Sequence, residues 1–284
     1  MKKRIVIIGG GASGLMAAIQ AARGGASVTL LERNEKPGKK LLATGNGRCN
    51  LTNLLQKESC YHGDQREFAW KVIGGFPADR TIAFFSSLGI YTKNRDGWIY
   101  PNSDQAASVL QVLLMEASSL KVKMKTREAV RSVKKVGCTF LTETETWKYE
   151  SDAVIVACGS PASSIEGASD TACAIAESFG HTVIPFRPAL VPLRGQGSWF
   201  SKWAGVRISA SATLILAGAD ARTETGEIQL TDYGISGIPV FQLSRFAVRA
   251  LDEGCSVLVR LDFLPGYERE NLHTYLEWRR EQCP

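Results

Sequence analysis

The sequence has no long apolar run and no clustered metal-binding side chains. No stretch approaches the roughly 20 consecutive apolar residues that a membrane-spanning helix requires. The seven cysteines are an odd set without a Cys-x-x-Cys pair, and the three histidines are scattered singly. These patterns argue against a disulfide framework and a zinc site. We therefore expect a cytoplasmic protein with reduced thiols, no structural metal and no membrane partner.

Net positive charge is confined to the first part of the chain. The net charge is +6, but residues 1–48 hold nine Lys or Arg and two acidic residues, a local charge of +7. The rest of the chain therefore sums to −1. A nucleic-acid partner would need a basic face elsewhere, so we expect none, and we attribute the local excess to an anionic small ligand.

A strand–turn–helix pattern opens the chain. An apolar strand over residues 4–8 leads into Gly9-Gly10-Gly11-Ala12-Ser13-Gly14, followed by a small-residue helix over 15–23 and a second strand that ends at Glu32. Gly9, Gly11 and Gly14 have the spacing for a tight turn, for backbone approach to a pyrophosphate and for close packing of helix on strand. Glu32, 18 residues after Gly14, can accept both hydroxyls of an adenosine ribose. With these flanking elements the motif predicts a dinucleotide site at the helix N-terminus, rather than an ordinary glycine turn.

A second glycine-rich segment follows. Residues 34–43 are loop-like with a short apolar part, and Thr44-Gly45-Asn46-Gly47-Arg48-Cys49-Asn50 alternates glycine with polar residues. Backbone N–H groups in such a segment can face an anion or a polar ring edge. We favour ligand contact over an irregular surface loop.

Residues 38–53, together with the first glycine turn, resemble the bacterial family of NAD(P)/FAD-dependent oxidoreductases that includes aminoacetone oxidase and the BaiN-type flavoproteins. The resemblance implies that FAD is the resident dinucleotide, with NAD(P)H as a candidate electron donor. It also implies that the flavin lies along residues 44–50 and that the backbone of Val130 lies near the adenine. Family members continue with a final strand and a glycine-rich segment, for which this sequence has no counterpart.

The expected fold class is α/β. Short alternating strands over residues 122–149 predict an antiparallel meander, and Asp152–Gly159 reads as a buried strand of the parallel sheet. This order is typical of a Rossmann-like FAD-binding domain of the glutathione-reductase class. We expect this domain to span residues 1–189 and an inserted, substrate-side β-containing domain, incomplete by the resemblance, to span 190–284.

The cofactor residues expected from the motifs and the resemblance are Gly9, Gly11, Ala12, Ser13, Gly14, Glu32, Arg33, Lys40, Thr44, Gly45, Asn46, Gly47, Arg48, Cys49, Asn50, Val130, Ala157 and Gly159. Arg48 would lower the pKa of Cys49, but no second cysteine is near in sequence, so a packing role is favoured over a redox role. The loop 167–172 departs from the glycine-rich family pattern. Tyr233 and Ser236, in a glycine-containing loop before a helix, are either substrate contacts or fixed by turn chemistry.

We expect an FAD-dependent oxidoreductase that transfers hydride or electrons between flavin and a small-molecule substrate or NAD(P)H. No Ser/His/Asp or paired-carboxylate arrangement is evident, so no catalytic side chain is assigned. Two alternatives remain open: an RNA-modifying flavoprotein, and a catalytically silent flavin-binding fragment. The sequence does not indicate an oligomeric state.

Overall fold

The computed structural model describes residues 2–162 and 165–283. The chain divides between Ile184 and Pro185 into two compact units, a few residues before the boundary expected from the sequence. Each unit has its own hydrophobic core. The two units are therefore described separately.

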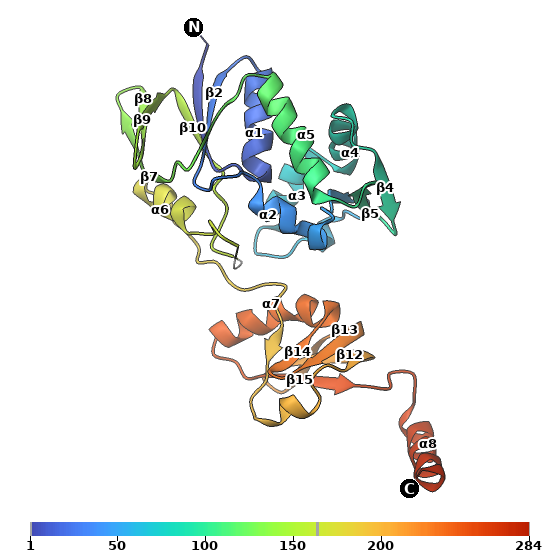
Figure 1. Ribbon diagram of the computed structural model, residues 1–284. Helices are drawn as coiled ribbons and strands as arrows, with labels where there is room; N and C mark the ends of the chain where they lie inside the picture. The colour runs from blue at the N-terminus through green and yellow to red at the C-terminus, as the bar shows by residue number, and fades with distance from the viewer. Residues whose placement is uncertain (1, 163–164, 284) are drawn as a thin grey trace. The chain divides into compact units, whose positions relative to one another are not determined.

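A four-stranded parallel sheet is the centre of the first unit (Figure 1). Its strand order is β10-β1-β2-β6, and the strands are β1 (Arg4–Ile8), β2 (Ser27–Glu32), β6 (Lys123–Thr126) and β10 (Ala153–Val156). Helix α1 (Ala12–Arg23) connects β1 to β2. Because successive side chains of a strand point to opposite faces, the apolar run of β1 contributes to a buried apolar cluster on each face of this sheet.

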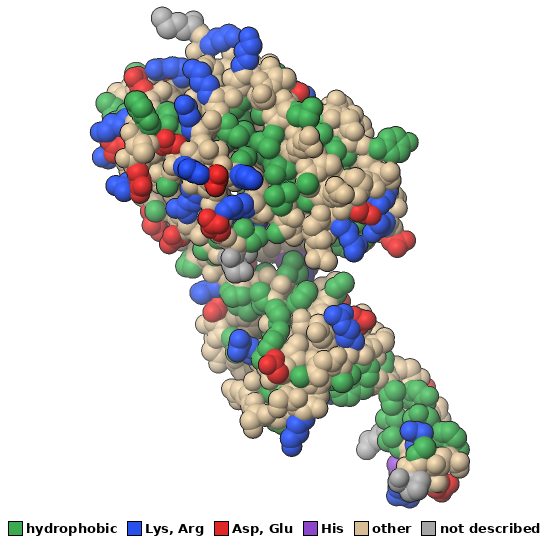
Figure 2. All heavy atoms as spheres, viewed as in Figure 1, with side chains coloured by type: hydrophobic (Ala, Val, Ile, Leu, Met, Phe, Trp, Pro, Cys, Tyr) green, Lys and Arg blue, Asp and Glu red, His purple; other side chains and the backbone are tan. Residues whose placement is uncertain are grey.

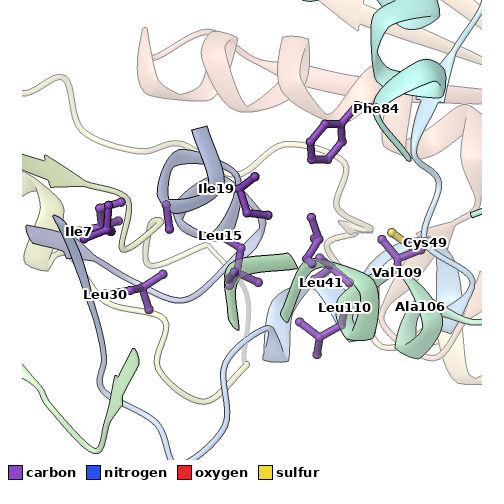
Figure 3. Close-up of a cluster of buried hydrophobic side chains, with 14 residues drawn as sticks. Ile7, Leu15, Ile19, Leu30, Leu41, Cys49, Phe84, Ala106, Val109 and Leu110 are labelled. Atoms are coloured by element: carbon purple, nitrogen blue, oxygen red, sulfur yellow. The ribbon is translucent and has the colours of Figure 1, made fainter. Parts of the chain in front are cut away.

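One face of this sheet packs against helices. Ile7 of β1 and Leu30 of β2 share a buried cluster with Leu15 and Ile19 of α1 and with Val109 of α5 (Ala106–Ser119) (Figure 3). Arg23 of α1 also pairs with Glu116 of α5 at 2.7 Å. The remaining elements on the helical side are α2 (Lys39–Ala43), β3 (Thr52–Asn53), α3 (Arg66–Gly74), α4 (Ala78–Ser87), β4 (Thr92–Arg95) and β5 (Trp98–Pro101).

The other face packs against an antiparallel meander. Val6 and Ile8 of β1 share a second cluster with Val130 and Val133. The meander has the order β7-β8-β9, with β7 (Val130–Val136), β8 (Thr139–Thr144) and β9 (Lys148–Ser151), and α6 (Thr171–Ser178) adds Ile175 to the cluster. The α/β class with a parallel sheet and a meander is confirmed, except that β6, expected in the meander, pairs in parallel with β2.

The second unit contains a five-stranded antiparallel sheet covered by one helix (Figure 1). The strand order is β11-β14-β13-β12-β15. The strands are β11 (Leu193–Arg194), β12 (Arg207–Leu216), β13 (Ala219–Thr231), β14 (Gly234–Ser236) and β15 (Val257–Asp262), and the helices are α7 (Ile238–Asp252) and α8 (Arg269–Gln282). Leu214 and Ile228 of the sheet pack with Val240 and Leu243 of α7 in a buried apolar cluster.

The segment expected as a loop before α7 is partly a strand. Gly234–Ser236 pairs with both β11 and β13, so backbone pairing fixes this segment in addition to turn chemistry. Gly234 has φ +150°, and a Cβ atom there would lie 2.2 Å from the carbonyl oxygen of Leu193. A glycine is therefore needed for this close strand contact. The ring of Tyr233 lies 5.3 Å from the guanidinium of Arg194, and its role toward substrate stays a prediction.

Within the described residues, none of the helices has both the length and the apolarity to cross a bilayer. The same part of the chain contains no cluster of three or more His, Cys, Asp or Glu side chains arranged to hold a metal ion. All seven cysteines are free thiols.

Candidate functional site

A cavity of about 530 Å³ opens at the carboxyl ends of β1, β2 and β10 in the first unit. This is the edge at which parallel α/β sheets bind cofactors, and the volume is within the range of small-molecule sites. The lining contains 13 of the 18 residues expected from the sequence: Gly9, Gly11, Ala12, Ser13, Glu32, Arg33, Lys40, Thr44, Cys49, Asn50, Val130, Ala157 and Gly159.

The three motif glycines have different surroundings. A Cβ atom on Gly14 would lie 1.8 Å from the carbonyl oxygen of Gly9, and one on Gly9 would lie 2.5 Å from the carbonyl oxygen of Ala157. These two glycines therefore allow the close contact between turn, helix and strand, and Gly14 does not line the cavity. A Cβ on Gly11 would meet nothing within 4 Å, because this residue faces the open cavity. A side chain at position 11 would fill space that a ligand can occupy.

Helix α1 begins at this cavity. Gly11 is its N-cap residue, and the amide of Leu15 donates to the carbonyl of Gly11 at 2.9 Å. The preceding amides, of Ala12, Ser13 and Gly14, belong to the first turn, where helix geometry provides no intrahelical acceptor. The first turn also contains no acidic residue. Together with the helix dipole, these N–H groups form a site for an anion such as a pyrophosphate.

Glu32 is held rigidly at the end of β2. Its side chain is buried, Oε2 accepts the Gly10 amide at 2.7 Å, and Oε1 accepts the Asn34 amide at 2.8 Å. A carboxylate has about four lone-pair sites, so each oxygen can accept one more hydrogen bond from the cavity side. Glu32 is thus preorganised to receive the two hydroxyls of a ribose.

Three cationic side chains that line the cavity contact the segment that follows β10. Lys39 pairs with Glu166, and Lys40 Nζ donates to the carbonyl of Ala162 at 3.1 Å. Arg33 Nη1 is 3.4 Å from the carbonyl oxygen of Gly167. These contacts hold the segment after β10 against the cavity, and Ile165–Ser169 and Thr171 join the lining.

The second glycine-rich segment forms a tight left-handed turn. Gly45, Asn46, Gly47 and Cys49 all have φ between +55° and +81°. A Cβ on Gly45 would lie 2.9 Å from the Asn50 amide nitrogen, so the turn closes on itself. Of this segment, only Thr44, Cys49 and Asn50 line the cavity. Gly45, Asn46, Gly47 and Arg48, which were also expected to contact the cofactor, are exposed outside it.

Cys49 is a buried residue rather than an activated thiol. It belongs to the apolar cluster shown in Figure 3, where Val109 is among its neighbours. Burial raises the pKa of Cys49, and a hydrogen bond with Thr44 only partly opposes this. The expectation that Arg48 lowers this pKa is therefore wrong. Burial likewise raises the pKa of Cys158, the second cysteine of the lining.

Several lining residues were not predicted from the sequence. An apolar group comes from α1, α2, α4 and α5 and the adjoining loop: Met16, Leu41, Leu51, Phe85, Val109 and Leu113. Helical periodicity marks such residues as core, and no local signal separates core from cavity wall. Glu128 also lines the cavity and accepts a hydrogen bond from Thr146 at 2.8 Å.

The residues present fit FAD. An open cradle at Gly11, free amides at a helix N-terminus and a fixed carboxylate at Glu32 match the pyrophosphate and the ribose of its ADP half. The fold and the site thus define a Rossmann protein for a dinucleotide with an ADP half, the class to which the FAD-dependent oxidoreductases belong.

The chain belongs to the family described as HI0933-like protein Rossmann domain, whose model matches residues 3–249. It is 48% identical, over 283 residues, to a 3-dehydro-bile acid delta(4,6)-reductase of Clostridium scindens; the match covers 99% of this chain and 69% of that protein. The resemblance to this family of flavoproteins is confirmed.

More distant relatives have a different activity in their names. The chain is 28% identical to a ribosomal RNA dihydrouridine synthase of Haemophilus influenzae, covering 93% of this chain and 65% of that protein. The chain spans about two thirds of the length of these curated relatives. Among solved structures, a thioredoxin reductase from Streptococcus pyogenes is similar with a TM-score of 0.32 and 18% identity, over 55% of this chain and 35% of that one.

Proposed function

We propose that this chain is the FAD-holding and substrate-facing part of a reductase that acts on a carbon–carbon double bond conjugated to a ketone. Two facts support the proposal: the cavity fits the ADP half of FAD, and the relative named for such a reduction is 48% identical over nearly the whole chain. When bound, FAD supplies the hydride chemistry. NADH or NADPH is the proposed electron donor.

The chain's own residues bind and orient in this proposal. The α1 amides of Ala12 and Ser13 hold the pyrophosphate, and Glu32 holds the ribose of the ADP half. Thr44, Cys49 and Asn50 border the part of the cavity proposed for the flavin ring. The open cavity face at Gly11 is the single observation on which the cofactor assignment depends.

The test has two readouts. The purified chain should carry a yellow chromophore with flavin absorbance, and the holoenzyme should be bleached anaerobically by NADH or NADPH. It should then convert a 3-oxo-Δ4 steroid into a product heavier by two hydrogen atoms, measured by mass spectrometry. A colourless protein that does not take up added FAD would contradict the cofactor assignment, whereas a yellow protein without turnover would contradict only the substrate class.

A second candidate is modification of ribosomal RNA, which the names of the 27–28% identical relatives suggest. Against it, Figure 2 shows Lys and Arg side chains mixed with Asp and Glu side chains on the visible face, whereas nucleic-acid binding favours clustered positive charge. Salt-sensitive retention of ribosomal RNA by the holoenzyme, with reduction of uridine, would favour this candidate over the steroid-like substrate.

A further inference from the structure

Two arginines of the second unit contact one aromatic ring. Arg222 of β13 and Arg245 of α7 lie with their guanidinium carbons 5.1 Å and 4.6 Å from the centroid of Phe246. Both distances are within the range of cation–π contacts. Phe246 itself packs against the core between α7 and the sheet. The two cations are therefore held at a fixed place on the unit.

The charge of this cluster is not balanced. Arg222 Nε donates to Glu224 at 2.6 Å, but the Nε of Arg245 is buried and has no acceptor within residues 2–162 and 165–283. Burial lowers the pKa of Arg245, and the charge of Arg222 adds to this effect while Glu224 opposes it. Two guanidinium groups thus share one carboxylate, which leaves a charge of +1.

Arg245 differs from other arginines of the same unit. Four of them pair directly with a carboxylate: Arg187 with Asp252, Arg207 with Glu227, Arg249 with Glu253 and Arg260 with Asp220. A guanidinium offers five donors in a planar fork that matches a carboxylate. The buried Nε–H of Arg245 carries a desolvation cost, and among the described residues no ion pair to a carboxylate engages the terminal N–H groups of its fork.

We propose that Arg245 and Arg222 bind the carboxylate of an acidic, largely apolar substrate, whose apolar part contacts the Phe246 ring. One negative charge neutralises the cluster, whereas a phosphate dianion would leave it with a net charge of −1. The proposal rests on the proposed function, because the bile acid in the relative's name is such a carboxylate. It assigns a specificity site to residues of the second unit.

The test compares a 3-oxo-Δ4 steroid carboxylate with its methyl ester, by equilibrium dialysis against the purified protein loaded with FAD. Wild type should bind the acid at least about tenfold more tightly than the ester, as expected for charge-assisted pairing. Arg245→Met should reduce this ratio to near one, and Arg245→Lys should keep part of it. Arg207→Met removes a paired arginine of the same unit and should leave the ratio unchanged.

Equal binding of acid and ester by wild type, or absence of binding by either, would overturn the inference. An equal loss of the acid-to-ester binding ratio in Arg207→Met would also overturn the inference. Circular dichroism of each variant checks folding. If Arg245→Met does not fold, Arg245→Lys, which retains a cation, still tests the site. The inference and the proposed function fail separately: selective binding without turnover contradicts only the reaction, and turnover of acid and ester with equal binding contradicts only the site.

Discussion

Gly11 and Gly14 are three residues apart in one turn, yet they respond to different requirements. Gly14 is covered by the Gly9 carbonyl, whereas Gly11 has ordinary negative φ and free space in front of it. A methyl group at position 14 has no room within the protein. A side chain at position 11 meets only the ligand space, so the two positions separate folding from binding.

We therefore expect Gly11→Val to fold normally and to bind FAD at least about tenfold more weakly, because its side chain fills the cradle at the helix N-terminus. Gly14→Ala should instead lower the free energy of unfolding by about 1–3 kcal/mol through overpacking. Thermal unfolding of the cofactor-free proteins and fluorescence titration with FAD measure both effects. A Gly11→Val protein that binds FAD like wild type would contradict the proposed position of the pyrophosphate.

Glu32 stabilises the turn even without a ligand, because its two oxygens accept the Gly10 and Asn34 amides. Glu32→Gln replaces one acceptor by an amide donor that would face an N–H group. We expect the cofactor-free variant to be about 1–3 kcal/mol less stable, the usual cost of a buried donor left without its acceptor. Chemical denaturation measures this, and unchanged stability would show that the two bonds are dispensable.

At the scale of elements, the meander contains one carboxylate with a strongly shifted titration. Glu143 of β8 accepts hydrogen bonds from Lys148 and Ser132, and Lys134 lies near it. The hydrogen bond from Lys148 is the largest of the effects that lower the pKa of Glu143 to about 2, from an ordinary value of 4.5. Because the folded pKa is depressed, its stabilising contribution is complete above pH 4.5 and is lost as the pH falls toward 2.

We expect the thermal midpoint of wild type to fall more steeply between pH 5 and pH 2 than that of Glu143→Gln, which has no charge to lose. Glu145→Gln, which removes an exposed carboxylate paired with Arg131, is the matched control on the turn that follows the same strand. A carboxyl-carbon NMR titration of Glu143 should have its midpoint near 2. Parallel curves for the three proteins would contradict the assignment.

Elements with a local signal were predictable from the sequence. The apolar run of β1 and the glycine spacing before α1 each depend on neighbours in sequence, and each is present in the structure. β6 was assigned to the wrong sheet because its alternating pattern does not reveal its partner. The pairing of β6 with β2 depends on contacts between residues that are far apart in the sequence.

Tertiary contacts decided the other differences. An aspartate just before a helix is a common N-cap, but the Asp104 carboxylate accepts from Lys93 at 2.5 Å and Arg95 at 2.6 Å, and α5 begins after Gln105. Likewise, Ile165–Ser169 and Thr171 line the cavity because Arg33 and Lys39 contact this segment across the sheet edge. No pattern within those segments contains this information.

At the scale of the whole molecule, the two units have separate cores and are joined by an exposed, proline-containing segment. Residues 185–190 are all exposed, and Phe186 is 54% exposed. We expect brief chymotrypsin treatment to cut after Phe186 and release two protease-resistant fragments near the lengths of the units. Phe186→Ser should delay this cut in a gel time course. Cleavage that begins inside either unit would contradict the division.

The anchoring of Glu32 by the Gly10 and Asn34 amides also limits which residues this position can accept. Exchanging this acid for a small neutral residue is the simplest way to admit a 2'-phosphate, but here the same exchange would remove the fastening of the neighbouring backbone. A variant with a neutral residue at position 32 would need a new acceptor for these two amides. The proposed nucleotide contact and the stability of the turn thus depend on the same side chain.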